Sequence, residues 1–398
     1  MSNSNLKLIK LACYMGYIIQ AIVINLSPIL FTTLIDEFKF SYSNLSILII
    51  TNFITQILCN IFLFHAVKKF GFKPFALIAN IFCFLGFISF SITPYIFRTF
   101  PFLMFIFSTI IFSIGGGIFQ LILSPIIHSL ESDNKHSSMS LLHSFYAWGQ
   151  VSIILLTTFY FFIFGKENWR FIVLFWCIVP IINFFIFLKT TLEFKQEDDE
   201  IHFLKLIKHP TFIIALIAIA SGAATELVIN QWISIFIKKG LNLSIIFSNL
   251  VGMCGFALML GAGRLLFGLL GKKLNIYNLM ISGSILSIIA YLIIGFSSSK
   301  WISIISCILC GLLTSILWPG TLTTTSEKIP KHGISLFAFL AASGDIGAGF
   351  APWLLGFLTT KFTSNMFDIQ SSLKFSLLIV TIFPIITLIT LIKLKLKK

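Results

Sequence analysis

The chain consists of long apolar runs that follow one another almost from end to end. Hydrophobic residues make up 57% of its 398 residues and charged residues only 11%. A helix needs roughly 20 apolar residues to cross the bilayer core, which is about 30 Å thick, and the chain offers such runs repeatedly. The runs lack the period-two alternation of barrel strands and exceed their length. We therefore expect an all-α polytopic membrane protein with little room for a soluble domain.

Charged and turn-forming clusters divide this apolar sequence into twelve candidate membrane spans. Several exceed the minimum length, which permits tilt or extension past the headgroups. The expected spans are 8–34, 44–67, 74–95, 102–127, 138–164 and 169–190 in the first half, and 210–237, 244–270, 276–298, 301–325, 334–360 and 371–392 in the second.

The distribution of lysine and arginine predicts the orientation of these spans. With twelve spans, the side that carries both termini would hold eighteen Lys and Arg residues and the other side nine. Because basic residues concentrate on the cytoplasmic side, both termini are expected to be cytoplasmic, in a multi-pass protein of the cytoplasmic membrane. The net charge of +14 then reflects topology and affinity for anionic lipid headgroups. No basic domain is available for nucleic acid.

The longest polar stretch, residues 191–209, separates the two groups of six spans. It reads TLEFKQEDDEIHFLKLIKH and changes from acidic to basic. We expect residues 1–190 to form an N-terminal six-helix bundle, 191–209 a cytoplasmic loop, and 210–398 a C-terminal six-helix bundle. This is the parallel-repeat layout of a large class of transporters.

A short internal sequence similarity relates the two halves. In the first half, Pro125 precedes a Gly-Gln pair that ends at Gln150; in the second, Pro319 precedes a Gly-Asp pair that ends at Asp345, at almost the same spacing. Two such matches can arise by chance, so they support internal symmetry without proving it. They suggest that Gln150 and Asp345 are symmetry-related positions in spans five and eleven.

Two acidic residues, Glu226 and Asp345, lie near the middle of apolar spans. An isolated charge at the bilayer centre costs roughly 3 kcal/mol or more, so such groups face water, a partner or a substrate. Both are candidates for carrying a coupling proton. The alternatives are a structural hydrogen bond for Glu226, with Asn230 one turn later on its face, and pairing of Asp345 across a tight glycine-rich interface that includes Gly344.

The sequence shows no metal site, cofactor site or enzyme motif. Cys307 and Cys310 form a C-x-x-C motif inside an apolar helix, where core packing is the favoured reading. His128, His136 and His143 lack a metal-ligand spacing. No phosphate-binding loop or nucleophile–base spacing is present. An ATP-driven pump and a membrane-embedded enzyme are therefore disfavoured, and a receptor built on a transporter fold stays open.

These features together resemble the major facilitator superfamily over essentially the whole chain. The loop signature of that superfamily is degraded here: HAVKKFGFKP keeps Lys69 and Gly71 but places Lys68 where an acid is expected. Its second copy, GRLLFGLLGKKLN, contains Arg264. The resemblance implies gating or structural roles for Lys69, Gly71, Arg264 and Gly344. For Arg264 we expect an anchor for the loop or a side chain that snorkels to the headgroups. The resemblance also implies a monomer.

Three segments resemble the branch that contains fucose–proton and related sugar symporters. They are SLLHSFYAWGQV, TELVINQWIS and SGDIGAGFAPWLLG. The resemblance implies alternating access by rocking of the halves about a central cavity. Fucose-type symporters carry acids in spans one and four, whereas this chain has Gln20, Asn25 and Gln120 there. Any titrating group would then be Glu226 or Asp345.

The resemblance and the polar residues of the spans together predict a transporter of a small polar solute, most simply a sugar or related compound, with protons as a possible coupling ion. The alternative is a proton-coupled exporter of amphipathic cations that uses Glu226, favoured by the abundance of phenylalanine. Tryptophans can stack on a sugar ring or anchor a helix at the membrane interface. The candidate substrate-binding residues are Gln20, Asn25, Gln120, His143, Trp148, Gln150, Asn230 and Trp318.

Overall fold

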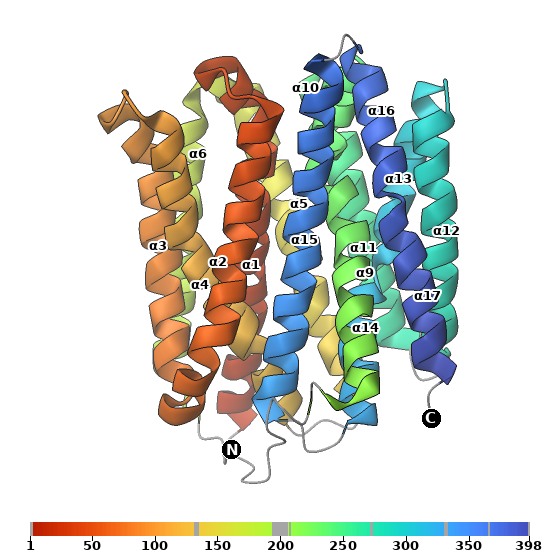
Figure 1. Cartoon of the computed structure of the whole chain (residues 1–398). Helices are drawn as coiled ribbons and strands as arrows, with labels where there is room; N and C mark the ends of the chain where they lie inside the picture. Colours follow the sequence, from red (N-terminus) through yellow and green to blue (C-terminus); the bar gives the residue numbers. More distant parts are fainter. Residues whose placement is uncertain are drawn as a thin grey trace.

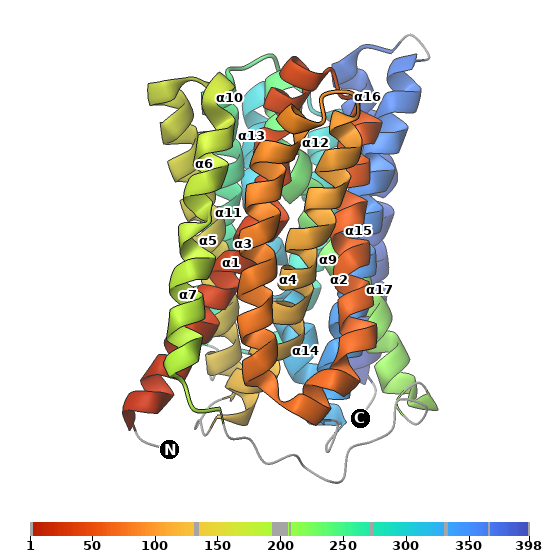
Figure 2. The same cartoon turned by 90° about the vertical axis from the view of Figure 1, so that its left-hand side faces the viewer.

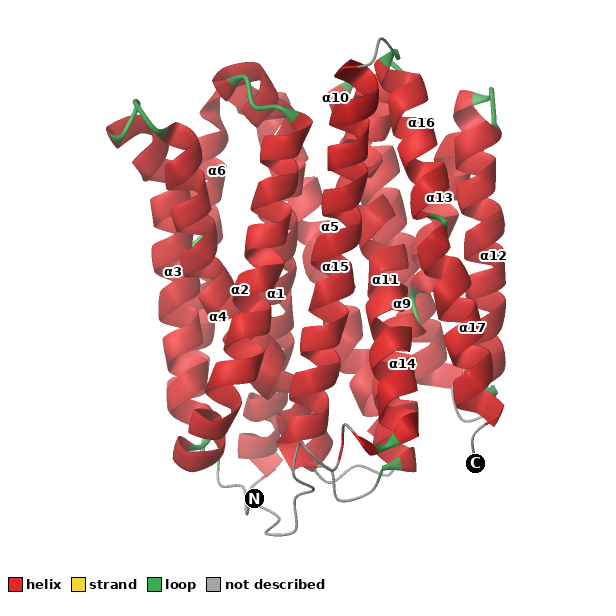
Figure 3. Ribbon diagram, viewed as in Figure 1, coloured by secondary structure: helices red, strands yellow, loops and turns green. Residues whose placement is uncertain are grey.

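A computed structural model describes residues 3–130, 135–192, 206, 208–270, 274–329, 333–364 and 367–396. Within these residues there is no strand, and twelve helical stretches are long and apolar enough to cross a membrane (Figure 3), as the sequence predicts. Most of the central polar loop lies outside the described residues.

The first six spans are formed by α1 to α7. Their bounds are α1 (Asn3–Phe38), α2 (Tyr42–Phe70), α3 (Phe72–Ile96), α4 (Pro101–Ser129), α5 (Lys135–Phe164) and, for the sixth span, the short turn η1 (Lys166–Asn168) with α6 (Trp169–Trp176) and α7 (Ile178–Lys189).

The last six spans are formed by α9 to α17. The seventh span is α9 (Pro210–Ile235) with the π-helical turn η2 (Phe236–Gly240), and the eighth is α10 (Ile245–Phe247), the π-helical η3 (Ser248–Met253) and α11 (Cys254–Leu270). The remaining spans are α12 (Ile276–Phe296), α13 (Lys300–Thr314) with α14 (Leu317–Lys328), α15 (Gly333–Ser364), and α16 (Ile369–Val380) with α17 (Ile382–Leu396).

The helices stand side by side along one common direction (Figures 1 and 2). Both chain ends lie at the same end of the bundle, at the bottom of Figure 1. We call this end the terminal face and the opposite end the far face. Large apolar side chains cover the outside of the bundle; Phe62 and Phe162, for example, are each 70% exposed. An apolar outer surface of this kind is compatible with the hydrocarbon core of a bilayer, which contains no water.

Three spans are interrupted, and a proline explains each interruption. The helical pattern breaks at Cys177, at Ser315 and Ile316, and at Thr381. Each break ends three residues before a proline, which has no N–H to donate and whose ring clashes with the carbonyl four residues earlier. The carbonyl groups freed in this way are available to other side chains, which matters for the site described below.

The two halves meet along two lateral contacts, α2 with α15 and α5 with α11. Glycines let the helices approach closely. Between the halves, a Cβ atom at Gly349 would lie 2.8 Å from Cβ of Phe53 on α2; within the second half, one at Gly347 would overlap the carbonyl oxygen of Ala220 on α9. Small residues at such positions allow backbones to pack together within a membrane.

Candidate substrate cavity

A central cavity of about 60 Å³ lies between the halves, with space for several water molecules. Polar side chains in a bilayer persist where they face such a cavity or one another. Both halves of the chain contribute to its wall. The lining residues are Tyr17, Gln20, Ile24, Phe53, Gln120, Leu123, His143 and Tyr146 from the first half and Glu226, Leu227, Arg264, Trp318, Asp345 and Ala348 from the second.

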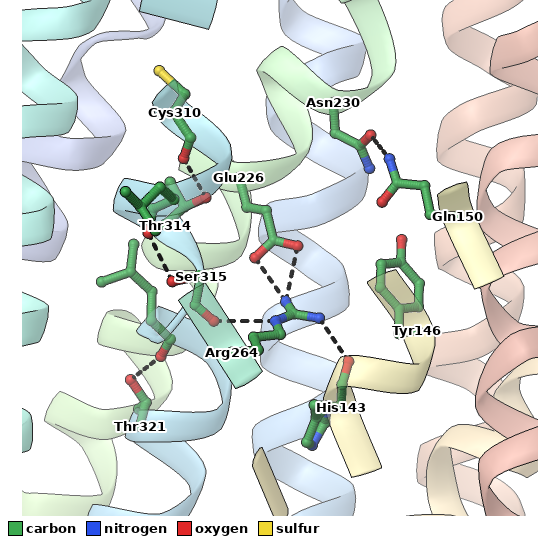
Figure 4. A network of polar contacts seen from close by, with 12 residues as sticks. His143, Tyr146, Gln150, Glu226, Asn230, Arg264, Cys310, Thr314, Ser315 and Thr321 are labelled. Atoms are coloured by element: carbon green, nitrogen blue, oxygen red, sulfur yellow. Dashed lines mark hydrogen bonds and ion pairs between the residues drawn. The ribbon is translucent and has the colours of Figure 1, made fainter. Parts of the chain in front are cut away.

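A buried ion pair between Arg264 and Glu226 occupies one wall of this cavity (Figure 4). One terminal nitrogen of the Arg264 guanidinium group lies 3.1 Å from both carboxylate oxygens of Glu226. Each residue is only 3% exposed. Two buried charges are tolerated when they pair and their remaining polar atoms are hydrogen-bonded, so the pair neutralises itself within the wall.

The rest of the Arg264 guanidinium group binds two backbone carbonyls. Nε donates to the Ser315 carbonyl oxygen at 3.1 Å, and the other terminal nitrogen donates to the His143 carbonyl oxygen at 3.2 Å. The Ser315 oxygen is free because Pro319, four residues later, has no N–H for it. The guanidinium carbon also lies 5.6 Å from the ring centre of Tyr146. The expectation that Arg264 snorkels or anchors the loop is therefore wrong, because its charge is satisfied inside the protein.

Asp345, on α15, forms a second polar link between the halves. Its Oδ1 accepts a hydrogen bond from Gln120 Nε2 on α4 at 2.8 Å, and its Oδ2 accepts one from Asn60 Nδ2 on α2 at 3.2 Å. Asn60 Nδ2 also lies 2.8 Å from Gln120 Oε1. Among the ion pairs formed by the described residues, none involves Asp345. Its carboxyl group is thus held by amides alone.

An amide cluster of Asn25, Tyr146, Gln150 and Asn230 adjoins the cavity. Gln150 Nε2 donates to Asn230 Oδ1, and Asn25 Nδ2 lies 3.3 Å from the Tyr146 hydroxyl (Figure 4 shows three of the four residues). Asn25 Oδ1, Gln150 Oε1 and Asn230 Nδ2 are buried without a hydrogen-bond partner. Unpaired buried polar atoms are costly. These atoms therefore have unused hydrogen-bonding capacity beside the cavity-lining Tyr146.

The remaining polar groups of the wall are largely paired. The Tyr17 hydroxyl lies 2.9 Å from Ser124 Oγ and 3.4 Å from His143 Nε2. Gln20 Nε2 donates to Gln56 Oε1 at 2.6 Å, whereas Gln20 Oε1 has no partner. The wall thus presents an acceptor on its first-half side as well.

The two candidate tryptophans occupy different places. Trp318 lines the cavity, and its indole ring fills the space beside Gly344, where a Cβ atom would overlap it. Trp148 is 36% exposed and is not among the lining residues. Helix geometry explains this: Trp148 follows Tyr146 by two residues, which turns it about 200° away around the helix. We therefore leave Trp148 out of the site.

The other sequence-based candidates fall into three places. Gln20, Gln120, His143, Trp318, Glu226 and Asp345 line the cavity, and Asn25, Gln150 and Asn230 adjoin it. Asn230 follows Glu226 on α9 but binds Gln150. Gly71 ends α2 with φ +79°, which favours glycine, and the exposed Lys69 ammonium lies 5.4 Å from the Phe70 ring centre. These last two lie at the terminal face, away from the cavity.

Three polar residues that line the cavity or bind Asp345 are not predicted from the sequence: Tyr17, Tyr146 and Asn60. Their spacing is informative in retrospect. Tyr17 precedes Gln20 by three residues, and Tyr146 follows His143 by three, so each lies on the same helix face as a candidate. Asn60 is a polar residue within an apolar span, the signal that selected the other amides.

Contacts between the halves lie on both sides of the cavity. Toward the far face, the Trp232 ring of α9 lies 6.2 Å from that of Phe31 and 6.4 Å from that of Tyr42, centre to centre. Toward the terminal face, the rings of Phe64 and Phe339 are 5.7 Å apart. The cavity therefore lies between two aromatic layers.

Charged residues add an outer layer at the far face. The Asp36 carboxylate lies 2.7 Å from Lys166 Nζ of its own half, and 3.6 Å and 4.0 Å from Lys238 Nζ and Lys239 Nζ of the other half. These groups are 18% to 40% exposed in their side chains. Partly exposed ion pairs contribute about 0–1 kcal/mol. They can thus open without a large energetic cost.

In the part of the chain that the structure describes, no group of three or more His, Cys, Asp or Glu residues is arranged to hold a metal ion. The cavity instead offers one self-neutralised ion pair, one carboxyl group held by amides, several neutral hydrogen-bonding groups and aromatic faces. Such groups can form hydrogen bonds and aromatic contacts with a small molecule.

Comparison with known proteins identifies the fold. A family model described as Major Facilitator Superfamily matches residues 13–352. No curated protein sequence matches significantly. Among solved structures, the proton:xylose symporter XylE bound to 6-bromo-6-deoxy-D-glucose has a TM-score of 0.80 at 13% identity, with 99% of this chain and 96% of that chain covered.

Two further structures are similar over nearly the whole chain. A variant of the E. coli fucose:proton symporter FucP gives a TM-score of 0.72 at 14% identity, covering 97% and 98% of the two chains. A bacterial homologue of the human lysosomal transporter Spinster, inward-facing and occupied, gives 0.75 at 14% identity, covering 99% and 98%. At these identities the likeness concerns the fold.

Proposed function

Because the chain belongs to the Major Facilitator Superfamily of membrane transporters, we propose that it carries a small neutral polar solute, such as a sugar or polyol, by alternating access. The solute would bind in the central cavity between the halves. The two halves would then rock about it, exposing it first to one side of the membrane and then to the other.

One observation carries the choice of a neutral solute. The only cation among the charged groups lining the described cavity, Arg264, is engaged by Glu226 and by two carbonyl oxygens. It therefore has little capacity left for an anionic solute. The unpartnered atoms of Asn25, Gln150 and Asn230 are neutral donors and acceptors, which suit the hydroxyl groups of a sugar because each hydroxyl both donates and accepts.

Aromatic groups complete this proposed site. Trp318 and Phe53 line the cavity on the second-half and first-half sides, and aromatic faces can pack on the apolar face of a sugar ring. The sugar substrates named for two similar structures, xylose and fucose, agree with this choice. The Spinster homologue has the same fold, so the choice depends on the cavity residues and not on overall shape.

An organic cation is the second candidate solute. The carboxyl group of Asp345 has no ion-pair partner among the described residues and shares the cavity with Phe53 and Trp318. A carboxylate near aromatic faces suits a lipophilic cation. In this scheme Asp345, and not Glu226, would bind the cation, because Glu226 is already paired with Arg264.

Ligand-dependent thermal stability of the purified protein distinguishes these candidates. A ligand that binds only the folded protein at 100 times its Kd stabilises it by about 2.7 kcal/mol. The panel would contain sugars, polyols, nucleosides, amino acids and lipophilic cations. We expect one neutral sugar family to raise the unfolding temperature. A shift with lipophilic cations alone would replace the sugar proposal with that of a cation exporter.

A matched pair of variants ties such a shift to the cavity. Trp318→Phe changes a lining residue, and Trp301→Phe changes a residue that is 61% exposed on the outside of α13. We expect Trp318→Phe to reduce the stabilisation by the sugar and Trp301→Phe to leave it unchanged. Equal responses of both variants would place the ligand elsewhere.

We also propose that the terminal face is cytoplasmic and that the carrier acts as a monomer in the cytoplasmic membrane. The excess of basic residues near the termini supports this orientation. Fusion of a reporter that is active only in the cytoplasm to the C-terminus tests it. An inactive reporter would reverse the proposed orientation.

A further inference from the structure

Asp345 contacts the first half through uncharged amide groups, which is unusual for a carboxyl group inside a membrane. Asp345 belongs to the second half, yet both of its carboxyl oxygens accept hydrogen bonds from first-half amides, Gln120 and Asn60. The residue is 1% exposed, and Asn60 is fully buried. The negative charge of a carboxylate at this depth is therefore offset by amide dipoles alone, which is costly compared with pairing to a cation.

The amides around Asp345 suit both of its protonation states. An amide group carries N–H donors for a carboxylate and a carbonyl oxygen that accepts from the O–H of a carboxylic acid. Asn60 Oδ1 has no hydrogen-bond partner although it is buried. It is a ready acceptor for a protonated Asp345 after a small rotation of either side chain. The site thus contains an acceptor for the protonated acid, Asn60 Oδ1, that takes part in none of the observed hydrogen bonds.

We propose that Asp345 is the proton-binding site of this carrier, with Asn60 and Gln120 as its positioning residues. Protonation forms an O–H bond on one carboxyl oxygen from a solvent proton and turns that acceptor into a donor. It also removes the charge that strengthens both hydrogen bonds between the halves. Proton binding therefore weakens the link of α15 to α2 and α4. This link joins the two halves, and alternating access requires the halves to move apart at such a contact. This inference rests on the proposed transport function.

The other titratable groups near Asp345 do not take over this role. From α2 the Cys59 thiol lies within electrostatic reach of Asp345, and from α9 Glu226 lines the same cavity. Glu226 is held by Arg264 of α11, so its charge is already compensated. Across the cavity, His143 of α5 lies beside Arg264 through its carbonyl oxygen.

The remaining helices packed against α15 present few ionisable groups to it. At the cavity, α4 and α14 contribute Gln120 and Trp318, neither of which titrates. Nearer the terminal face, the His128 ring of α4 lies 5.2 Å from the Phe337 ring of α15. The one charged residue of α16, Lys374, donates to the Ser297 carbonyl oxygen at 2.6 Å. Among the described residues no cation forms an ion pair with Asp345, and Arg264, the cation that lines the same cavity, is engaged by Glu226.

Infrared spectroscopy of the protein in liposomes tests the proposal without any solute. The C=O stretching band of a protonated carboxyl group would be followed as the pH falls from about 9 to about 6, a range in which ordinary carboxyl groups stay ionised. We expect a reversible band in the unaltered protein and in Glu226→Gln, and its loss in Asp345→Asn. A band that persists in Asp345→Asn, or no band in the unaltered protein, would overturn the assignment.

A second variant keeps the test decisive if Asp345→Asn fails to fold. Asn60→Ala retains the carboxyl group but removes one donor to its ionised form. We expect the proton affinity reported by the band to rise several-fold, because the ionised form loses a charge-assisted hydrogen bond and the neutral acid only a weaker one. An unchanged affinity would contradict the role of Asn60. Replacing choline by sodium at fixed pH should leave the band unaltered; its loss would show that the site binds Na⁺ instead.

Transport separates this inference from the proposed function. Once a sugar has been identified, Asp345→Asn should exchange it by counterflow but should not accumulate it in response to a proton gradient. Trp301→Phe, on the outside of α13 and away from the cavity, serves as the comparison. If no neutral solute is carried by the unaltered protein while the band behaves as expected, the proposed function fails and the proton site stands. If gradient-driven uptake survives in Asp345→Asn, the proton site fails.

Discussion

The ion pair of Arg264 and Glu226 allows the most quantitative prediction. Removing one partner of a buried ion pair costs about 3–5 kcal/mol, because the other charge is left uncompensated. Arg264→Met also frees the carbonyl oxygens of Ser315 and His143, although cavity water can reach part of this space. We expect Arg264→Met to lower the free energy of unfolding by about 4 kcal/mol and Glu226→Gln by about 3 kcal/mol.

A double-mutant cycle isolates the interaction itself. When both residues are replaced, no uncompensated charge remains, so the double variant should be far less destabilised than the two single effects predict. We expect a coupling energy of about 2–4 kcal/mol. Reversible unfolding in mixed micelles, with a denaturing detergent as the perturbant, measures it.

The far-face ion pair of Asp36 and Lys238 provides the matched control for this cycle. It also joins the two halves, but its side chains are 35% and 18% exposed. Asp36→Asn with Lys238→Met should give a coupling energy below about 1 kcal/mol. A coupling energy below about 1 kcal/mol for Arg264 and Glu226 as well would refute the reasoning, since it would mean that their charges are solvated and not buried.

Three further outcomes follow from the structure. Gln150→Ala should weaken binding of the sugar about tenfold by removing one hydrogen bond that a buried polar ligand needs, as measured by the concentration dependence of thermal stabilisation. Gly347→Ala should destabilise the protein by about 1–3 kcal/mol through overlap with the α9 backbone, whereas Gly222→Ala, whose added Cβ would lie 3.3 Å from its nearest neighbour, should cost less than about 1 kcal/mol. Asp36→Asn should increase the labelling of cysteines introduced near the cavity by a reagent added on the far-face side, with little loss of stability.

The sequence predicts the spans well because the bilayer imposes a simple rule. A run of roughly 20 apolar residues has few alternatives to a membrane helix, and all twelve expected spans are found among the described residues. Several helix ends extend further than expected; α1 reaches from Asn3 to Phe38, past the predicted 8–34. Polar residues at the ends of a span continue the helix, and hydropathy does not register them as part of it.

The residues of the cavity are predictable only in part. A polar side chain inside a span indicates an internal site, and this signal predicts Gln20, Gln120 and Asp345. The partner of a polar residue is harder to predict: Arg264 and Glu226 are 38 residues apart in the chain, and the packing of α13 against both α9 and α11 brings them together. A proline four residues after a carbonyl group is a local sequence signal that this carbonyl oxygen lacks its helical donor, as Pro319 shows for Ser315.

Pro28, in the first span, also releases a carbonyl oxygen. The Ile24 carbonyl oxygen loses its helical donor because Pro28 has no N–H. Gln231 Nε2 of the opposite half lies 3.4 Å from this oxygen. Carbonyls released by prolines thus serve as acceptors for polar side chains of other helices, within the second half for Ser315 and between the halves for Ile24.

Counterflow in proteoliposomes tests the central claim most directly. Vesicles loaded with an unlabelled sugar, beginning with D-xylose and D-fucose and extending to the sugar selected by thermal stabilisation, would be diluted into the same labelled sugar without any ion gradient. The account predicts transient accumulation of label that is reduced in Trp318→Phe and unaltered in Trp301→Phe. No accumulation of any neutral solute, together with exchange of a lipophilic cation such as tetraphenylphosphonium, would contradict it.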